Sequence, residues 1–470
     1  MTAFLHIRTT TLASLLFACL LAASCKKLIE IPPNPPDQIP ERQVFNDSAD
    51  IMAAVVGIYA NFKTTAGSPW FGSGAITQTT GMSSDEILST RASDPTASQF
   101  SQNALSTDNS SLGSLWTDAY QNIYQMNACL AGIRNTTAIS ERLKRQLLGE
   151  ISVTRAFYYF NLVNLFGGMP LVTSTDYNTS ATLPRSSVDS VYLLIQSDLA
   201  YARTVLQPAY PSAGHMRPNL YTALALSSRV CLYRQQWDSA AQMAGQLISS
   251  GVYTLEQDPN NVFLEGSSEA IWQLPANGSY NQTAEGAGFI PSFSAPNYTV
   301  TDFLLNAFEP GDLRNTDWVG TAVIHNYSTN TDVTYRFPYK YKNKDVFGST
   351  TEDYMIFRLG EQYLVLAEAQ AHQNKLTDAL DNLNQLRTRA GLTGSSASTQ
   401  TDVLAAIMHE RQTELFCEWG HRWYDLKRTG AIDNVMATEK PGLWQPDAAL
   451  YPIPRQETQY NPLLKQNHGY

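Results

Sequence analysis

The stretch Arg155–Val172 reads RAFYYFNLVNLFGGMPLV, and it decides the fold class of this chain. Aromatic and aliphatic residues fill its first part, and then Gly167–Gly168 and Pro170 give the stop signals that are typical of a helix C-terminus. On the N-terminal side, Ser140 is a residue type that caps helices. The pattern therefore predicts one long helix over Glu141–Phe166.

Helical spacing of apolar residues continues on both sides of this stretch. Further helices are predicted over Asp47–Lys63, Leu112–Ile133, Val188–Leu206, Leu220–Gln235, Ser239–Ser250, Glu352–Gln373, Asp378–Ala390 and Asp402–Glu418. The chain is therefore predicted to have a mainly α-helical fold.

Two segments share a pattern in which a helix follows a short polar turn: WDSAAQMA from Trp237 and LTDALDNL from Leu376. We expect Asp238 and Thr377 to cap these helices, and the small residues to let each helix approach the preceding one. This is the pattern of a tetratricopeptide helix pair, but no fixed period links the two copies. It predicts helix pairs embedded in a compact body rather than an open solenoid.

Two long stretches, at about 64–106 and 251–350, are rich in Gly, Ser, Thr, Asn and aromatic residues instead. Short β-like runs occur within them at Val319–His325 and Thr334–Tyr341. Long loops of this composition on a helical scaffold are typical of a binding protein.

The N-terminus has the pattern of a lipoprotein signal. The apolar run Thr11–Ala23 is too short to span a bilayer, which takes about 20 residues, and it suits a signal peptide. Small residues lead into Cys25, which predicts lipidation there, the alternative being an ordinary signal with an incidental cysteine. Ala22 departs from the usual lipobox Leu, and the basic Lys26–Lys27 leaves the membrane leaflet open.

These patterns divide the chain into four parts. We expect a signal peptide at 1–24, a lipidated cysteine with a Pro-rich tether at 25–44, an N-terminal helical region at 45–250 and a C-terminal region at 251–470. The last two are expected to form one body. The prolines of the tether favour an extended polyproline conformation.

Composition excludes several classes of protein. Hydrophobic residues make up 43% of the chain and charged residues 16%, which indicates a globular protein. The net charge of -10 argues against binding to nucleic acid or to an anionic membrane surface. Cys129, Cys231 and Cys417 are too scattered for a disulfide framework or a zinc site, and we expect the last two in the core.

Five stretches in fixed order carry a resemblance to a known family. They are the opening stretch at Arg155–Val172, YRFPYKYK from Tyr335, the segment from Arg358 through AEA at 367–369 to NQLRTRAGL from Asn384, the segment from ERQTEL at Glu410 to GHRWYDLKRTG at Gly420, and LYPIP from Leu450 with QNHGY at the end. Together they resemble proteins of the SusD/RagB family, which bind nutrients at the outer membrane.

The resemblance implies a SusD-like helical fold, with tetratricopeptide-like helix pairs beneath a loop-rich face that carries a few short strands. It implies an outer-membrane lipoprotein that needs no cofactor and catalyses nothing. The implied partners are a glycan or peptide ligand and a TonB-dependent transporter of the SusC kind.

Charged residues in these motifs have a structural and a catalytic interpretation. They are Glu410, Glu414, Glu418, Arg422, Asp425 and Arg428, together with Arg358, Glu361, Glu368, Arg387 and Arg389. Two of the carboxylates would suffice for acid-base chemistry, but pairing between helices is the favoured interpretation. Glu418 and Arg422 have the spacing of an ion pair within one helix.

Ligand-binding candidates come from the loops, because aromatic rings pack against the C–H faces of sugars and polar neighbours bind the hydroxyls. They are Trp70, Phe71, Asp85, Tyr280, Phe293, Tyr298 and Trp318. Packing in the core is the alternative for each of them.

Catalytic motifs are incomplete. His409–Thr413 begins like a zinc-protease HExxH motif but has Thr413 in place of the second histidine. The acidic pairs Asp85–Glu86 and Glu352–Asp353 suggest glycoside hydrolysis only weakly, and the second pair is expected to open a helix. A binding lipoprotein is therefore favoured over a glycoside hydrolase, and over a tetratricopeptide adaptor for protein partners.

Overall fold

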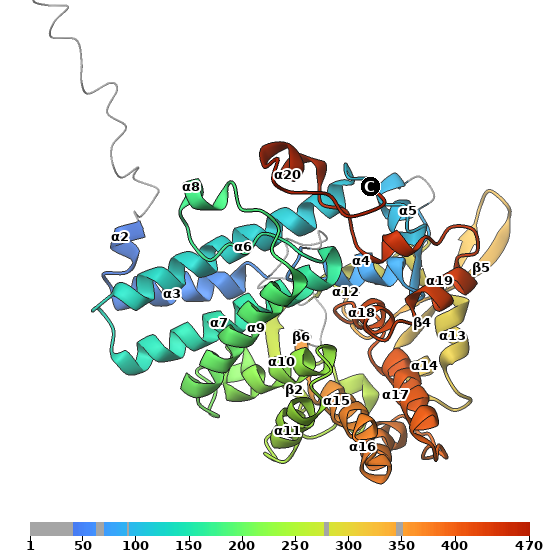
Figure 1. The fold of residues 1–470 in the computed structure, drawn as a ribbon. Coiled ribbons are helices and arrows are strands. Elements are labelled where there is room, and N and C mark those ends of the chain that lie inside the picture. The colour runs from blue at the N-terminus through green and yellow to red at the C-terminus, as the bar shows by residue number, and fades with distance from the viewer. Residues whose placement is uncertain (1–40, 63–69, 92–93, 277–281, 345–350) are drawn as a thin grey trace, which may run out of the picture.

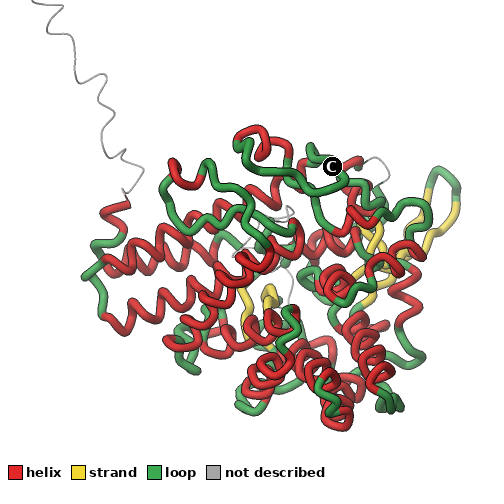
Figure 2. The backbone as a smooth tube through the Cα atoms, viewed as in Figure 1, coloured by secondary structure: helices red, strands yellow, loops and turns green. Residues whose placement is uncertain are grey.

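The computed structural model is mainly α-helical (Figures 1 and 2) and describes residues 41–62, 70–91, 94–276, 282–344 and 351–470. The helices of its N-terminal part are α2 (Glu41–Val44), α3 (Ser48–Ala60), α4 (Ala75–Ser83), α5 (Pro95–Ser101), α6 (Ser110–Asn135), α7 (Glu141–Phe166), α8 (Tyr177–Ser180), α9 (Val188–Val205), α10 (Leu220–Tyr233) and α11 (Trp237–Ile248). Those of the C-terminal part are α12 (Ala284–Phe289), α13 (Asp302–Ala307), α14 (Leu313–Asp317), α15 (Leu359–His372), α16 (Leu376–Arg389), α17 (Gln400–Glu414), α18 (His421–Arg428), α19 (Ile432–Glu439) and α20 (Arg455–Tyr460).

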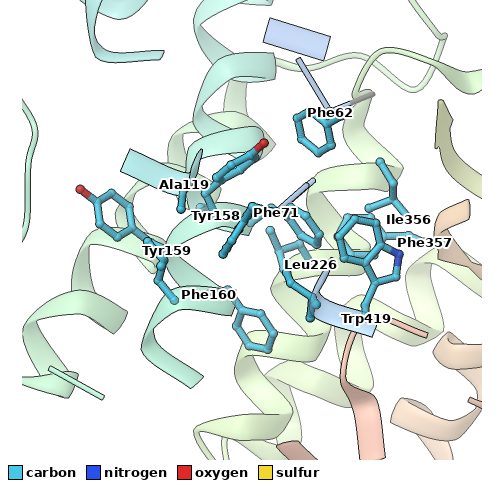
Figure 3. Close-up of a cluster of buried hydrophobic side chains, with 14 of the residues drawn as sticks. Phe62, Phe71, Ala119, Tyr158, Tyr159, Phe160, Leu226, Ile356, Phe357 and Trp419 are labelled. Carbon is cyan, nitrogen blue, oxygen red and sulfur yellow. The ribbon is translucent and has the colours of Figure 1, made fainter. Parts of the chain in front are cut away.

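Helix α7 lies in the middle of the core, as Figure 3 shows for its aromatic residues. Its bounds are those predicted from the sequence, and the hydroxyl of Ser140 accepts a hydrogen bond from the backbone N–H of Leu143 as its cap. Phe157 packs edge-on against Trp419, with ring centroids 5.0 Å apart, and against Phe357 at 5.7 Å. One contiguous apolar core therefore includes residues from both the 45–250 and the 251–470 parts.

The two predicted helix pairs are α10–α11 and α15–α16, and α11 packs against α15. The expectation that Asp238 and Thr377 cap the second helices is wrong. The N-caps are Gln236 and Lys375, which make no side-chain cap hydrogen bond. Asp238 instead accepts a hydrogen bond from Gln373 Nε2 at 2.9 Å. It therefore connects the first pair to the second.

The strands form three small antiparallel sheets. They pair β1 (Ile87–Ser89) with β3 (Tyr298–Val300), β2 (Ala270–Pro275) with β6 (Asp353–Arg358), and β4 (Val319–Asn326) with β5 (Thr331–Pro338). The β4–β5 hairpin confirms the two β-like runs and projects from the body in Figure 2.

The predicted helix over Glu352–Gln373 is wrong in its first part. Residues from Asp353 to Arg358 form strand β6, which is buried along its whole length, and the helix begins only at Leu359. The run DYMIF combines aromatic and β-branched residues, which favour a strand once a partner is present. That partner, β2, is far away in the sequence.

Helix α4 was not predicted, because it lies inside the first loop-like stretch. All of its residues are buried although most are polar or small. The hydroxyls of Thr79 and Thr80 donate to the carbonyl groups of Ala75 and Ile76, at 2.7 and 2.6 Å. These bonds satisfy the polar groups within the helix, so that it can be buried.

In the part of the chain that the structure describes, no helix combines enough length with enough apolar character to cross a membrane.

Candidate functional site

A polar cavity of about 160 Å³ lies where α4, α5, α6 and β3 meet. Its polar lining consists of Gln78, Thr79, Asp94, Thr96, Ser111, Ser114, Asp118 and Tyr298. Its apolar lining consists of Ala75, Met82, Ala97, Phe100 and Leu115. Hydroxyl, amide and carboxylate groups beside a small apolar surface can hold a sugar through both hydrogen bonds and packing.

Trp70 lies next to this cavity and is 37% exposed. Its backbone N–H donates to the carbonyl of Ser73 at 3.0 Å, and its carbonyl accepts from the N–H of Ala75 at 3.2 Å. The next backbone N–H, that of Phe71, donates to the carboxylate of Asp118 in the cavity lining. These bonds hold the turn that carries Trp70 against two residues of the cavity lining, Ala75 and Asp118.

Two buried side chains, those of Tyr354 and Glu285, stabilise the turn that carries Trp70. The N–H of Gly74, which has a φ of 82°, donates to the hydroxyl of Tyr354 at 2.6 Å. That hydroxyl in turn donates to Glu285 Oε1 on α12 at 2.6 Å. Burial raises the pKa of Glu285 to about 7.

Tyr298 forms another side of the cavity. Its hydroxyl donates to Gln78 Oε1 at 3.3 Å, and its ring is packed edge-on by Phe289 with centroids 5.6 Å apart. Burial raises the pKa of the Tyr298 hydroxyl, so it is a neutral donor and acceptor at physiological pH. Phe293, in the loop between α12 and β3, is 98% exposed.

The structure places the other predicted ligand-binding residues elsewhere. Phe71 is fully buried and stacks on Tyr158 with centroids 5.0 Å apart (Figure 3). Trp318 is also fully buried, and its Nε1 donates to the carbonyl of Pro259 at 2.9 Å. A ligand cannot reach either ring, so this structure corrects both expectations. Tyr280 lies outside the described residues.

Asp85 also has a structural position rather than one on the rim of a site. Its side chain is buried, and both of its oxygens accept hydrogen bonds from Arg422 Nε, at 2.8 and 2.9 Å. This pairing also corrects the expected ion pair between Glu418 and Arg422. Glu418 pairs instead with Arg358, whose Nε lies 2.8 Å from Glu418 Oε2.

Sequence reasoning missed three important residues of the cavity. Gln78 lies on the unpredicted helix α4, Asp94 caps α5, and Asp118 lies on the predicted helix α6 beside its apolar stripe. Each had an ordinary local explanation. The cavity arises from how four elements pack together, and no local pattern reports this.

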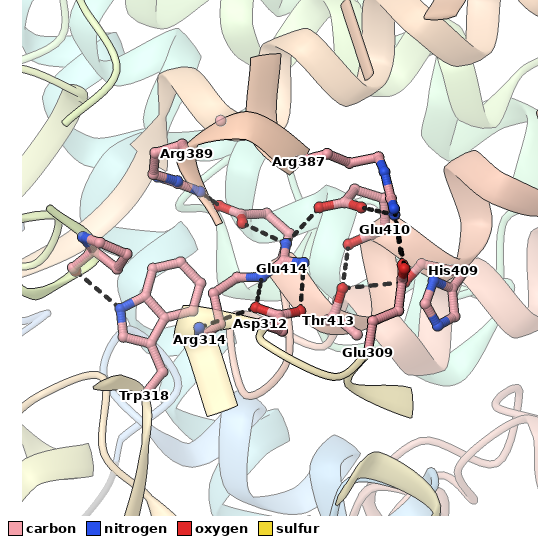
Figure 4. Close-up of polar contacts among 12 residues, drawn as sticks. Glu309, Asp312, Arg314, Trp318, Arg387, Arg389, His409, Glu410, Thr413 and Glu414 are labelled. Carbon is pink, nitrogen blue, oxygen red and sulfur yellow. Dashed lines mark hydrogen bonds and ion pairs between the residues drawn. The ribbon is translucent and has the colours of Figure 1, made fainter. Parts of the chain in front are cut away.

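The charged residues of the family-like motifs form a buried ion network, shown in part in Figure 4. Arg314 Nη1 lies 3.0 Å from Glu414 Oε2, and Arg389 Nη1 lies 2.7 Å from Glu269 Oε1. Burial raises the pKa of Glu414, but Arg389, Arg358 and Arg314 outweigh this and hold it well below its ordinary value. A carboxylate held so firmly in its charged form is a poor proton donor, which supports the structural interpretation.

The catalytic alternatives gain no support from geometry. The Nε2 atom of His409 lies 2.8 Å from the carbonyl oxygen of Ala307. Across the described ranges, no three His, Cys, Asp or Glu side chains are grouped so that they could hold a metal ion. Glu352–Asp353 does not open a helix, and Glu352 accepts the backbone N–H of Asn343 at 3.1 Å. Glu86 Oε1 accepts that of Cys417 at 3.1 Å. Both carboxylates are held by the backbone.

The cysteines have the positions expected of core residues. Cys231 and Cys417 are 6% and 5% exposed, which confirms the prediction for both. Burial raises the pKa of each thiol. Neither is therefore a reactive thiol.

Comparisons with known proteins agree with the fold. A family model described as "Starch-binding associating with outer membrane" matches residues 36–232, and a model described as "SusD family" matches residues 278–470. SusD-like protein P25 from Formosa agariphila is 26% identical, over 97% of this chain and 98% of the relative. SusD-like protein P38 from the same organism is 24% identical, over 95% and 96%.

Solved structures show the same fold at lower identity. A SusD superfamily protein from Bacteroides vulgatus has a TM-score of 0.78 at 20% identity, covering 91% of this chain and all of its own. A protein described as a laminarin-binding SusD-like protein has a TM-score of 0.75 at 22% identity, over 90% of this chain and all of its own. Surface glycan-binding protein A from Bacteroides fluxus has 0.73 at 22%, with the same coverage. With both family models matched in order along one SusD-like fold, this chain belongs to the SusD/RagB family.

Proposed function

We propose that this protein is an outer-membrane lipoprotein that binds an oligosaccharide and delivers it to a TonB-dependent transporter of the SusC kind. The observation that carries the proposal is the cavity lined by Gln78, Asp118 and Tyr298, next to the turn that carries the partly exposed Trp70. A ring next to convergent polar groups on a rigid scaffold suits a sugar. Glycan binding described for structural relatives supports the same ligand class.

The proposed role is binding without catalysis. The buried carboxylates of the family-like motifs are paired with arginines, as between Glu414 and Arg314, so they serve the scaffold. A glycan array followed by chromatography of the bound glycan tests this. We expect binding with no shortened product, whereas release of shorter sugars would show a hydrolase.

Attachment to the membrane is proposed through lipidation of Cys25, which follows a signal-like apolar run. We expect Cys25→Ala protein to leave the membrane fraction, while the wild type remains in the outer membrane. Recovery of the variant in the outer membrane would contradict the anchor. Co-purification of the wild type with a large β-barrel transporter tests the proposed delivery.

A further inference from the structure

The cavity beside Trp70 has an unbalanced charge. Asp94 and Asp118 both line it, and no Lys, Arg or His occurs among its lining residues. Arg91, a cation close enough to lower the pKa of Tyr298, donates through Nε to Asn297 Oδ1 at 2.9 Å and does not line the cavity. The charged residues of the cavity lining are therefore both acidic, which favours a ligand with positive charge.

Asp118 is the less compensated of the two carboxylates. Within the described ranges it accepts a hydrogen bond from the backbone N–H of Phe71, and no guanidinium or ammonium group offsets its desolvation. Burial consequently raises the pKa of Asp118. A carboxylate in this state gains most from a cation that arrives with the ligand.

One carboxylate oxygen of Asp94 forms hydrogen bonds within the fold. Its Oδ1 accepts the backbone N–H groups of Thr96 and Ala97 at 3.0 and 3.1 Å, as the cap of α5. None of the described hydrogen bonds involves Oδ2. Asp94 thus adds negative charge and an acceptor to the cavity.

The side-chain amide of Gln78 indicates a polar ligand, and this indication does not depend on the charge of the cavity. Its side chain is only 7% exposed, and its Oε1 accepts the hydroxyl of Tyr298. None of the described hydrogen bonds uses its Nε2 group, although Gln78 lines the cavity. This amide is therefore available to donate to a ligand that enters the cavity, and a sugar hydroxyl is a suitable acceptor.

We propose that this cavity binds one sugar unit that carries a free amine, with the ammonium group on Asp118 and hydroxyl groups on Gln78 and Asp94. The inference rests on the proposed glycan-binding function and specifies its substrate class. The volume of about 160 Å³ is below the range of drug-sized pockets, which suits a single unit rather than a chain segment. Carboxylated and sulfated sugars are excluded by the same negative charge.

Three oligomers of equal length and the same β-1,4 backbone provide the test, because they differ only at C2. They are the glucosamine, N-acetylglucosamine and glucose oligomers, with a glucuronic acid oligomer as the anionic probe. We expect the full-length protein to bind the cationic glucosamine oligomer roughly tenfold more tightly than the two neutral oligomers, and not to bind the anionic one.

Asp118→Asn removes the charge and keeps an acceptor for the Phe71 N–H, so it should abolish the advantage of the amine without unfolding the protein. Asp378→Asn is the matched control, because Asp378 is exposed on α16 and the net charge changes equally. The control should keep the full advantage. Survival of the advantage in Asp118→Asn, or equal binding of the three oligomers by the wild type, would overturn the inference.

A pH series gives a second readout on the same protein. The groups that face Asp118 are the Phe71 N–H and the neutral Tyr158, while Asp94 and Tyr298 share the cavity. Acidification protonates Asp118 but leaves an amine charged, so the preference for the amine should disappear as the pH falls through the raised pKa of Asp118. A preference that persists at acidic pH would contradict the assignment to Asp118.

Different binding results would refute the glycan-binding function and the preference for an amine. Lack of binding to every member of a broad glycan array would refute the proposed function itself. Binding of any neutral or anionic glycan together with no binding of the glucosamine oligomer would refute only the amine preference.

Discussion

Trp70 and Phe71 are neighbours in the sequence but have opposite surroundings. The indole of Trp70 is 37% exposed beside the cavity, whereas the ring of Phe71 is fully enclosed and stacks on Tyr158. Backbone alternation at the turn sends one ring outward and the next inward. The sequence predicts two aromatic residues in a polar loop, and only packing distinguishes a contact for ligand from a contact for the core.

Alanine substitutions at these two positions should therefore have different effects, one on ligand binding and the other on stability. Trp70→Ala is expected to weaken glycan binding with little change in melting temperature, because the ring has few core contacts. Phe71→Ala should lower the free energy of unfolding by about 3–5 kcal/mol, since it leaves a cavity in the core. Affinity and chemical denaturation of both variants check this, and a large loss of stability in Trp70→Ala would place its ring in the core.

At the scale of elements, the long periodic helices were predictable and the short ones were not. Helix α7 has its predicted bounds, because an apolar pattern, a Ser cap and a Gly stop all indicate the same ends. Helix α4 and strand β6 depend on partners that are distant in the sequence: Tyr354 binds Gly74 at the start of α4, and β2 pairs with β6. The propensity of a segment depends only on its own residues, so it does not indicate such partners.

The candidate site was predictable only in part for the same reason. Trp70 and Tyr298 were named as candidates because aromatic residues stand out in polar loops, and Tyr298 lines the cavity. Asp118 was not, because a carboxylate on a helix is ordinary until the cavity beside it is known. The charged motif residues were assigned correctly to the scaffold, but the pairing of Glu418 with Arg358 links residues that are distant in sequence.

The short helix α12 contributes two residues to the surroundings of the site: Glu285 accepts a hydrogen bond from Tyr354, and Phe289 packs against Tyr298. A Cβ at Gly286 would lie 2.4 Å from the carbonyl oxygen of Asn343, so Gly286→Ala must displace α12. We expect a loss of about 1–3 kcal/mol in stability together with weaker glycan binding, because Glu285 and Phe289 move with the helix.

Gly57 in α3 is the matched control for this substitution. A Cβ there would meet nothing within 4 Å, so Gly57→Ala should stabilise the protein by up to about 1 kcal/mol through helix propensity. Thermal melts and binding isotherms of the two variants provide the comparison. Equal stability of both would show that α12 tolerates the extra methyl group.

For the whole molecule, the buried ion network predicts sensitivity to acid. The pKa of Glu414 in the folded state is well below its ordinary value of 4.5. Its contribution to stability is therefore complete above pH 4.5 and is lost as the pH falls toward the folded-state value. Glu285 acts in the opposite direction, because its folded-state pKa of about 7 lies above its ordinary value of 4.5: its contribution to stability grows as the pH falls from about 7 and is complete below pH 4.5.

The melting temperature should accordingly fall steeply between about pH 5 and pH 3, and the fall should be smaller in Glu414→Gln. That variant is also less stable at neutral pH by about 3–5 kcal/mol, because it leaves buried arginines without a partner. Glu141→Gln is the control, since the Glu141 side chain is 75% exposed. An acid response in Glu414→Gln as steep as in the wild type would assign the effect to other carboxyl groups.

The central position of α7 has a consequence for how the protein is made. Helices α6 and α9 pack against it, but its ring partners Trp272, Phe357 and Trp419 come much later in the chain. Newly made N-terminal helices therefore lack part of their aromatic core until the C-terminal part of the chain has been synthesised. Folding of the whole molecule thus depends on the last third of its chain.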